Sequence, residues 1–522
     1  MRTDFGPGTM TDSGYPRIVK RWTRGTALAS AEEVFAGQKP DISVDATQHH
    51  LHIGDRVVYR TLVRRGVTFF TNETFHRAEE GKLVKLDLPA DAEAGLWRDQ
   101  LLVTLRGAWK RTRNADAGAV AQANANVNAA TGDYPAGALL AIDFDRFMAG
   151  ARDFKRLYEP GPRKSLGQSA GTLNTLLVNE MSEVQNHVFE WSLKDGQWTR
   201  RAVDLPRDGT IAMQPVGDDE SNDYFVYLSN ALQPTALALA RAGSDQREAL
   251  KHLPAFFNAS GLNVAQHEVR SADGTRIPYI EVTPKGYRQN GRAPTILYGY
   301  GGFEIPMLPR AYSAGNGAAW LERGGVFVVA GIRGGGEFGP DWHDAAIKVR
   351  KQNSYDDFIA VAEDLIARKV TSPAHLGIMG GSNGGLLVGA VALQRPELFK
   401  AVVCQVPLLD MRRYNQLLAG ASWMGEYGNP DVPAEWEYIS KYSPYQNVVK
   451  DRRYPRFLFT NSTRDDRVHP GHARKMAAKM NDQKHDLLYY ENTEGGHAGA
   501  ANNTQQARMN ALEYTFMARE LR

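Results

Sequence analysis

The pattern of apolar and polar residues changes about halfway along the chain. Up to about residue 257, short segments alternate apolar and polar side chains, with turn signals between them such as the Asp-Gly pairs at 195–196 and 208–209. This pattern is typical of half-buried antiparallel strands. At ~45 residues for each four-stranded blade, the segment is long enough for roughly five or six blades of a β-propeller. The sequence therefore predicts an all-β domain over 1–257. Its length favours a propeller, although no clean sequence repeat accompanies the pattern.

From about residue 290 the apolar residues come in unbroken runs. Runs such as Pro294–Tyr298 and Gly325–Ala330 are typical of strands buried on both faces of a parallel sheet. Ser354 is expected to cap one of the intervening helices. Alternating strands and helices predict an α/β domain with a doubly wound, mostly parallel sheet over 258–522, after a junction at 254–290. Further strands are expected at 376–379, 401–406, 457–460 and 486–490.

Composition narrows the class of protein. The 522 residues are too many for one ordinary core, and 42% hydrophobic with 23% charged residues is normal for a globular protein. The net charge of +3 gives no reason to expect nucleic acid or an anionic membrane as a partner. The single cysteine, Cys404, excludes an intrachain disulfide. Without a membrane-length apolar run or a signal-peptide core, a cytoplasmic location is expected, and the oligomeric state stays open.

The strongest chemical motif is G-x-S-x-G at 380–384, with Ser382 at its centre. It follows the strand expected at 376–379 and precedes the apolar run Leu386–Leu393, which is the strand–turn–helix context that this motif requires. Such a turn holds the serine hydroxyl clear of the backbone, and the N-terminus of the following helix favours developing negative charge. The motif predicts a nucleophilic serine; the alternative is a glycine-rich turn with an incidental serine.

A serine hydroxyl needs a base to take its proton. In the α/β-hydrolase order, an acid and then a histidine follow the nucleophile. Asp465 and Asp466 come after the strand expected at 457–460, and His497 lies among glycines after the strand expected at 486–490. These are strand ends, where ligands bind in open α/β sheets. The order predicts His497 as the base and leaves both aspartates as candidates for the acid.

Five stretches of the chain resemble the catalytic domain of the prolyl oligopeptidase family. They are YGYGGF at 298–303, GGGEFG at 334–339, GGSNGG at 380–385, DDRV at 465–468 and GGHAG at 495–499. The resemblance is close from about Tyr298 to the C-terminus, and the first half resembles the seven-bladed propeller of the family only loosely. It implies an α/β-hydrolase domain joined to a partial propeller that lacks the N-terminal segment and the early blades.

The resemblance implies a catalytic role for five residues. Ser382 corresponds to the nucleophile, His497 to the general base and Asp465, the first aspartate of DDRV, to the triad acid. The hydroxyl of Tyr300 and the backbone N–H of Asn383 correspond to the oxyanion hole. A packing role for Tyr300 at a strand end is the alternative, although the glycines around it favour a close approach to a ligand.

The same resemblance implies a pocket for the P1 residue of a substrate. Arg467 corresponds to an arginine that holds a substrate carbonyl, and Trp423 to a tryptophan on which proline stacks. Two alternatives come from the residues themselves. Trp423 and Tyr427 are four apart and fit a buried pair on one helix, and Arg467 fits an ion-pair partner of Asp466. The remaining pocket wall corresponds to Phe303, Tyr427 and Val468.

The resemblance implies a serine peptidase that hydrolyses short proline-containing peptides on the C-terminal side of proline, with no metal or organic cofactor. One alternative is a related serine hydrolase with acylaminoacyl, dipeptidyl or ester substrates. Another is a truncated, non-catalytic propeller scaffold. A dinucleotide-binding oxidoreductase is suggested by G-x-G-x-x-G at 334–339, but Pro340 and Asp341 follow it instead of an apolar helix start. The histidines at 49, 50 and 52 have no further clustered ligand that would favour a metal site.

Overall fold

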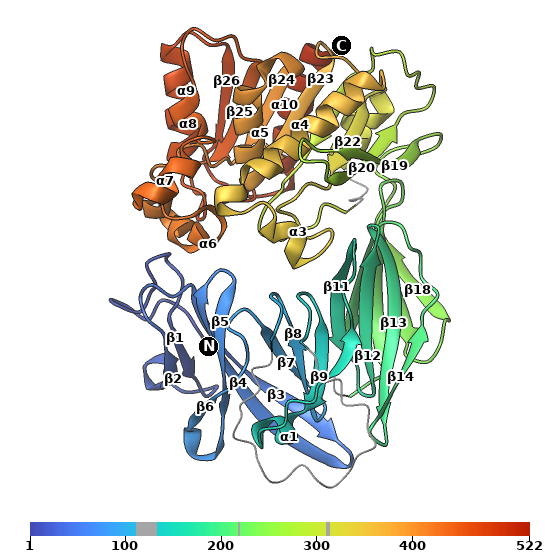
Figure 1. Cartoon of the computed structure of the whole chain (residues 1–522), viewed down its shortest axis with the longest axis vertical. Coiled ribbons are helices and arrows are strands. Elements are labelled where there is room, and N and C mark those ends of the chain that lie inside the picture. The colour runs from blue at the N-terminus through green and yellow to red at the C-terminus, as the bar shows by residue number, and fades with distance from the viewer. Residues whose placement is uncertain (111–132, 218–219, 309–313) are drawn as a thin grey trace.

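One mixed eight-stranded sheet and five smaller antiparallel sheets make up the fold (Figure 1). The structure is a computed structural model and describes residues 1–110, 133–217, 220–308 and 314–522. The small sheets occupy the first half of the chain, and the eight-stranded sheet with its helices occupies the second half. Within the described residues, no helix combines the length and the apolar character needed to cross a membrane.

Four of the small sheets have four strands each, and every one of these sheets is built from four consecutive strands of the chain. They stand side by side in chain order in Figure 1, and a two-stranded sheet, β1–β2, precedes them. The strands are β1 (Ile18–Arg21), β2 (Glu32–Ala36), β3 (Ser43–Ile53), β4 (Arg56–Thr68), β5 (Thr71–Arg77), β6 (Leu83–Lys85), β7 (Glu93–Trp97), β8 (Gln100–Thr104), β9 (Leu139–Asp143), β10 (Lys155–Tyr158), β11 (Lys164–Gly171), β12 (Thr175–Ser182), β13 (Gln185–Lys194), β14 (Gln197–Ala202), β15 (Thr210–Pro215), β16 (Asp223–Ser229), β17 (Ala236–Arg241) and β18 (Arg247–His252).

Consecutive four-stranded sheets bury apolar residues against each other. Leu62 of β4 shares one cluster with residues of β8 and β9, residues of β9 and β10 share the next with Val178 of β12, and Leu177 of β12 shares a third with Val226 of β16. Face-to-face packing of successive sheets is the architecture of a β-propeller. Against the roughly five or six blades expected from length, the described residues of this half form four four-stranded sheets and the two-stranded sheet β1–β2.

The eight-stranded sheet has the order β19-β20-β22-β21-β23-β24-β25-β26. Strands β21 to β26 pair in parallel, while β19 and β20 form an antiparallel edge. The strands are β19 (Asn263–Arg270), β20 (Arg276–Thr283), β21 (Thr295–Tyr298), β22 (Val326–Ala330), β23 (Leu376–Gly381), β24 (Ala401–Gln405), β25 (Arg456–Ser462) and β26 (Leu487–Asn492).

The expectation of a junction over 254–290 is wrong in part, because β19 and β20 lie within it. β19 is an edge strand that alternates exposed and half-buried residues, so its polar side chains resemble a loop in the sequence. The predicted domain boundary between residues 257 and 258 falls between β18 and β19 and stays a prediction.

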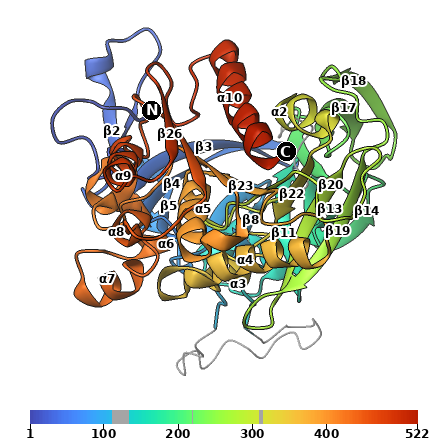
Figure 2. The same cartoon turned by 90° about the horizontal axis from the view of Figure 1, so that it is seen from above.

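Helices cover both faces of this sheet (Figure 2). α10 packs on one face in a cluster with Met379 and Val403, and α4 and α5 pack on the other face around Ile378. The predicted fold class, a doubly wound α/β-hydrolase sheet with an all-β propeller domain, is thereby confirmed. That the propeller is a partial one stays a prediction. The helices are α1 (Phe144–Met148), α2 (Ala314–Ala319), α3 (Pro340–Asp344), α4 (Gln352–Ala367), α5 (Asn383–Gln394), α6 (Met424–Tyr427), α7 (Pro433–Ile439), α8 (Pro444–Asn447), α9 (Gly471–Asp482) and α10 (Asn503–Leu521).

The expected capping role of Ser354 is wrong. α4 begins at Gln352, so Ser354 lies inside its first turn. The Ser354 hydroxyl instead donates a 2.8 Å hydrogen bond to the carbonyl oxygen of Arg333. This serine therefore ties α4 to the glycine-rich segment that follows β22.

A buried ion pair holds the same segment. Arg333 donates to both carboxylate oxygens of Asp357 in α4, at 2.6 Å and 2.9 Å, and the two side chains are 5% and 0% exposed. Asp273 also pairs with Arg333, but its side chain is 47% exposed. The same guanidinium therefore contacts one fully buried aspartate and one exposed aspartate.

Replacing Asp357 by alanine should lower the free energy of unfolding by about 3–5 kcal/mol, because it leaves a buried guanidinium charge without its main partner. The matched control is Asp273→Ala, which should cost no more than about 1 kcal/mol because solvent screens the exposed pair. Urea denaturation of both variants measures the difference. Equal losses would contradict the assignment of the buried pair as the stabilising one.

Candidate active site

Ser382 lies at a sharp turn between β23 and α5. Its φ of 59° and ψ of −117° are unusual for a residue with a side chain, and such conformations cost about 1–3 kcal/mol when the surroundings hold them in place. The N–H of Ser382 donates to the carbonyl of Gln405 in the neighbouring strand at 2.9 Å. A side chain at Gly384 would place its Cβ 2.7 Å from the carbonyl oxygen of Gly299. The glycine thus allows the 299–303 loop to lie directly against the start of α5.

Hydrogen bonds link the side chains of the three residues predicted as a triad, one to the next. His497 Nε2 is 3.2 Å from the Oγ of Ser382, and His497 Nδ1 is 2.8 Å and 3.0 Å from the two carboxylate oxygens of Asp465. Because the carboxylate accepts from Nδ1–H, Nε2 is the nitrogen free to accept the serine proton. The side chains of Asp465 and His497 are 1% and 13% exposed, so little water competes with this contact.

The backbone after Asp465 orients its carboxylate. The N–H groups of Arg467 and Val468 both donate to Asp465 Oδ1 at 2.9 Å. Asp466 is exposed and makes no contact of this kind with His497 in the described structure. The structure therefore brings the first of the two candidate aspartates, and not the second, to the imidazole.

Tyr300 and Asn383 lie on adjoining segments beside the serine. Burial raises the pKa of the Tyr300 hydroxyl above its usual value, although a hydrogen bond with Ser382 and the charge of Arg467 act in the opposite direction. The hydroxyl is therefore protonated and able to donate near neutral pH. The backbone N–H of Asn383 belongs to the first residue of α5, which has no partner within the helix. Two donors thus face the region of Ser382, as an oxyanion hole requires.

Asn383 also joins this loop to the predicted pocket wall. Its side-chain amide donates to the Tyr300 carbonyl at 2.5 Å, and its Oδ1 accepts from the Tyr427 hydroxyl at 2.7 Å. Tyr427 is fully buried, and its ring meets that of Phe303 edge-on at 5.8 Å. Tyr427 therefore supports Phe303 and Asn383 from behind.

Trp423 ends a 3₁₀ turn at 418–423, and Tyr427 ends α6, so the two do not belong to one regular helix. Trp423 and Val468 are 8% and 3% exposed and belong to the same apolar cluster. Phe303 is half-buried and packs on Phe69 of the β4–β5 turn, with ring centres 5.0 Å apart. Phe303 therefore lies at the boundary between the two halves of the molecule, in contact with Tyr427 on one side and Phe69 on the other.

Arg467 has an exposed side chain beside this pocket. The alternative pairing with Asp466 is absent from the ion pairs of the described part of the chain. The positive charge of its guanidinium instead acts to lower the pKa of the Tyr300 hydroxyl, against the larger effect of burial. A cation with this exposure remains available to a ligand.

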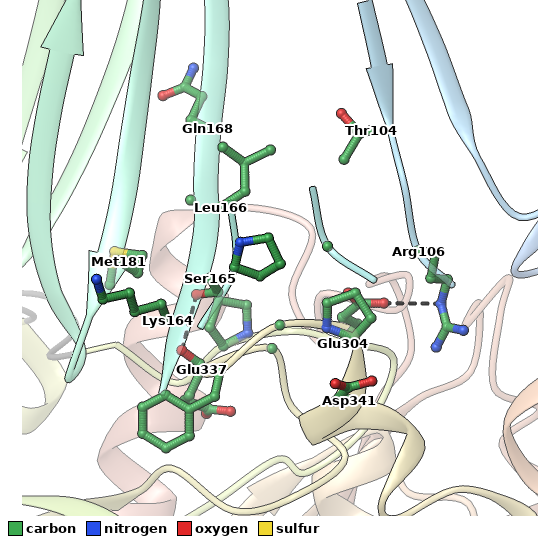
Figure 3. A pocket seen from close by; sticks show the side chains of 18 of the residues that line it. Thr104, Arg106, Lys164, Ser165, Leu166, Gln168, Met181, Glu304, Glu337 and Asp341 are labelled. Atoms are coloured by element: carbon green, nitrogen blue, oxygen red, sulfur yellow. Dashed lines mark hydrogen bonds and ion pairs between the residues drawn. The ribbon is translucent and has the colours of Figure 1, made fainter. Parts of the chain in front are cut away.

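A cavity of about 650 Å³ adjoins Phe303 between the propeller sheets and the hydrolase unit (Figure 3). The figure shows Arg106, which follows β8, joined to Glu304, and Ser165 of β11 joined to Glu337. Both contacts cross from the propeller to the loops of the hydrolase unit. The cavity therefore lies at the interface of the two units, beside the pocket wall.

Sequence reasoning missed the charged group behind Phe303. Glu426 is fully buried beside His343 and Lys351 and accepts hydrogen bonds from both side chains. The signal was an acidic residue between Trp423 and Tyr427, two residues already assigned to the pocket. A carboxylate in such an apolar setting needs partners, but the partners lie far away in the sequence.

The GGGEFG segment does not have the surroundings of a dinucleotide site. A side chain at Gly336 would place its Cβ 2.2 Å from the carbonyl oxygen of Glu304, so the segment packs directly on the loop after Tyr300. The helix that follows, α3, has five residues. In the described residues, no group of three or more His, Cys, Asp or Glu side chains is arranged to hold a metal ion.

Comparison with known proteins identifies the family. A sequence profile described as the prolyl oligopeptidase family matches residues 312–522. An uncharacterized peptidase of Sinorhizobium fredii is 42% identical over 524 residues, which cover 99% of this chain and 69% of that protein. The chain belongs to the prolyl oligopeptidase family. A member of the prolyl oligopeptidase family is a serine-type peptidase, so the predicted family and enzyme class are confirmed.

Two further members of the prolyl oligopeptidase family carry functional names. A prolyl endopeptidase of Elizabethkingia miricola is 39% identical over 313 residues, which cover 59% of this chain and 44% of that enzyme. The structure of a post-proline cleaving enzyme from Rickettsia typhi superposes with a TM-score of 0.88 at 30% identity, covering 99% of this chain and 73% of that chain. Both are similar to this protein in sequence or in fold.

Replacing Ser382 by alanine should abolish labelling by a fluorophosphonate probe and lower peptide turnover by on the order of 10⁶, the scale for loss of a triad nucleophile. Asp465→Asn should lower turnover by about 10⁴ because the imidazole loses its required tautomer. The matched control is Asp466→Asn, which should stay within a few-fold of the parent. A larger loss from the Asp466 variant than from the Asp465 variant would overturn the assignment of the acid.

Proposed function

We propose that this protein is an oligopeptidase that cleaves short peptides on the C-terminal side of proline. The observation that carries the proposal is the hydrogen-bonded series of Ser382, His497 and Asp465, to which Asn383 joins the aromatic pair of Tyr427 and Phe303. The family resemblance assigns Trp423 and Val468 to the same pocket. The names of the Elizabethkingia and Rickettsia relatives support it. The cytoplasmic location and the independence from cofactors inferred from the sequence stay predictions.

In the proposed reaction, the Oγ of Ser382 attacks the carbonyl carbon of the P1 residue while His497 Nε2 takes the serine proton. Asp465 stabilises the resulting imidazolium. The Tyr300 hydroxyl and the Asn383 N–H donate to the oxygen that becomes negative in the tetrahedral intermediate. His497 then protonates the leaving amine, and the C–N bond breaks to give the acyl-enzyme.

Water completes the cycle. His497 removes a proton from the water that attacks the acyl carbon, and a second tetrahedral intermediate forms in the same oxyanion hole. The imidazolium returns its proton to the Ser382 oxygen as the ester bond breaks. The peptide acid leaves, and the serine hydroxyl is restored.

Proline suits an apolar, aromatic pocket for a physical reason. Its ring is compact, and its nitrogen carries no hydrogen once it is part of a peptide. A flat indole such as that of Trp423 can cover one face of the ring, and burial of that surface supplies most of the attraction. Another residue would bring a backbone N–H that needs a partner in the pocket. The pocket therefore favours proline over bulky or charged P1 residues.

A panel of matched peptides that differ only at P1 tests the proposal directly. The expected result is the highest kcat/KM for proline, a lower value for alanine and negligible cleavage after lysine, glutamate or phenylalanine. Preference for an N-acetylated amino acid, a dipeptidyl substrate or a simple ester would replace the proline assignment with one of the other activities of a serine hydrolase.

Replacing Tyr300 by phenylalanine keeps the ring and removes one donor. We expect a fall of ~10²–10³ in kcat, the scale for loss of one oxyanion-hole donor. KM should change little, because the donor matters most when charge develops on the oxygen. Steady-state kinetics on an anilide whose chemical step limits turnover measures this. An unchanged kcat would return Tyr300 to a packing role.

Replacing Trp423 by alanine should lower kcat/KM for prolyl peptides by the equivalent of about 1–3 kcal/mol, the scale for one altered apolar pocket contact. Matched alanyl peptides should lose less, since alanine has no ring to stack. The comparison uses both substrate series on the parent and the variant. Equal losses on the two series would mean that Trp423 supports the fold without distinguishing proline.

A further inference from the structure

Phe303 and Glu304 have an unusual backbone. Their φ angles are 55° and 58°, in the left-handed region that residues with side chains rarely adopt. They directly follow the glycines after Tyr300, so the proposed oxyanion donor and a wall of the proposed pocket lie on one short loop. Two neighbouring residues in this conformation persist only when surrounding contacts hold them.

Glu426 holds the loop from inside the hydrolase unit. Its carboxylate accepts the backbone N–H of Phe303 at 3.2 Å and is 2.6 Å from His343 Nε2. It also accepts from Lys351 Nζ at 2.9 Å, and Lys351 Nζ donates in turn to the Gly301 carbonyl at 2.9 Å. The same carboxylate therefore contacts the loop directly at Phe303 and through a lysine at Gly301.

The negative charge of Glu426 is paired with the positive charge of Lys351, and both side chains are buried. Burial alone would raise the pKa of Glu426, but the charge of Lys351 and the hydrogen bond from His343 hold it below its usual value. Lys351 is 1% exposed and Glu426 is 0% exposed. An ionised pair this deep needs every partner in position, so the loop contacts and the ion pair depend on each other.

Arg106 holds the same loop from the propeller. Its guanidinium is 3.2 Å from the Glu304 carboxylate and 2.5 Å from both His343 Nδ1 and the Asp344 carboxylate. Because a guanidinium only donates, His343 accepts at Nδ1 and donates from Nε2 to Glu426. One arginine of the propeller is thus connected to Phe303 through Glu304 on one side and through His343 and Glu426 on the other.

We propose that Glu426 and Arg106 are positioning residues for the loop that carries Tyr300 and Phe303. Glu426 acts from within the hydrolase unit, and Arg106 makes the geometry of the pocket wall depend on the propeller. The proposal rests on the roles given to Tyr300 and Phe303 in the proposed function. Neither positioning residue touches the substrate or the reacting atoms.

Another arginine at the interface provides a matched control. Arg163, which precedes β11, pairs with Glu268 of β19 and donates to the Arg276 carbonyl at 3.3 Å. Its side chain is 14% exposed, against 17% for Arg106. Its guanidinium also lies over the ring of Phe338, 4.2 Å from the ring centre, and none of these contacts is with the 300–304 loop. Replacing it weakens the contact between the two units without disturbing the group around Glu426.

The test compares Arg106→Met with Arg163→Met in the full chain. We expect Arg106→Met to lower kcat/KM for a prolyl peptide by about 3- to 30-fold, the range for residues that act through an intervening network, and to lower the ratio of prolyl to alanyl cleavage. Arg163→Met should leave both within about twofold, the error of such comparisons. An equal loss in the two variants would overturn the proposal, because it would reflect general weakening of the interface.

Double-mutant cycles separate positioning from a structural role. If Arg106 acts through the loop, its replacement should cost less than about twofold once Phe303→Ala or Tyr300→Phe has removed the group that it positions. A loss that persists in full in both backgrounds overturns the proposal. Glu426→Gln is measured in the same way if its melting curve shows a folded protein; if it does not fold, the Arg106 cycles still decide the outcome.

The cycles are read on whichever peptide the enzyme cleaves best. A failure of the proline assignment appears in the P1 panel of the unmodified protein and does not alter the cycles. A failure of the positioning proposal appears in the cycles and does not alter the P1 panel. The two results are therefore distinguishable.

Discussion

The parallel pairing of β23, β24, β25 and β26 is the constraint on which the active site depends. Gly381 pairs with Gln405, Gln405 pairs with Thr460, and Ser462 pairs with Asn492. Because these strands run in the same direction and in this register, their carboxyl ends reach one edge of the sheet. The serine, aspartate and histidine each leave the sheet at that edge. Residues more than a hundred positions apart therefore meet without any long connecting loop having to place them.

Close backbone contact completes the site at the same edge. The glycines at 299 and 384 let the loop after β21 lie against the start of α5, and Gly334 lies against the Gly301 carbonyl in the same way. A side chain at any of these positions would push apart the segments that carry Tyr300, Phe303 and Ser382. The glycine-rich motifs of this chain thus allow close packing between loops as well as unusual backbone conformations within each turn.

Much of the fold and the candidate site was predictable because the signals were local. The strand before Ser382, the glycines around it and the apolar helix after it are adjacent in sequence, and the structure has the same strand, turn and helix. The polar edge strand β19 was missed because one exposed face makes a strand resemble a loop. Ser354 was misread because a serine near a helix start can hydrogen-bond to a distant carbonyl instead of its own helix. The local sequence pattern does not reveal hydrogen-bond partners that are distant in the chain.

The sequence by itself determined the fold class and the order of the candidate catalytic groups, because periodicity, turn chemistry and motif spacing depend on residues that are neighbours in the chain. Residue chemistry alone left Asp465 and Asp466 as candidates, and the family resemblance favoured Asp465; in the tertiary structure two backbone N–H groups orient the Asp465 carboxylate, which contacts His497. The tertiary structure alone also brought His343 and Lys351 to Glu426, and Arg106 to His343. A buried charge is stable only beside partners, and those partners come from segments that no spacing rule connects.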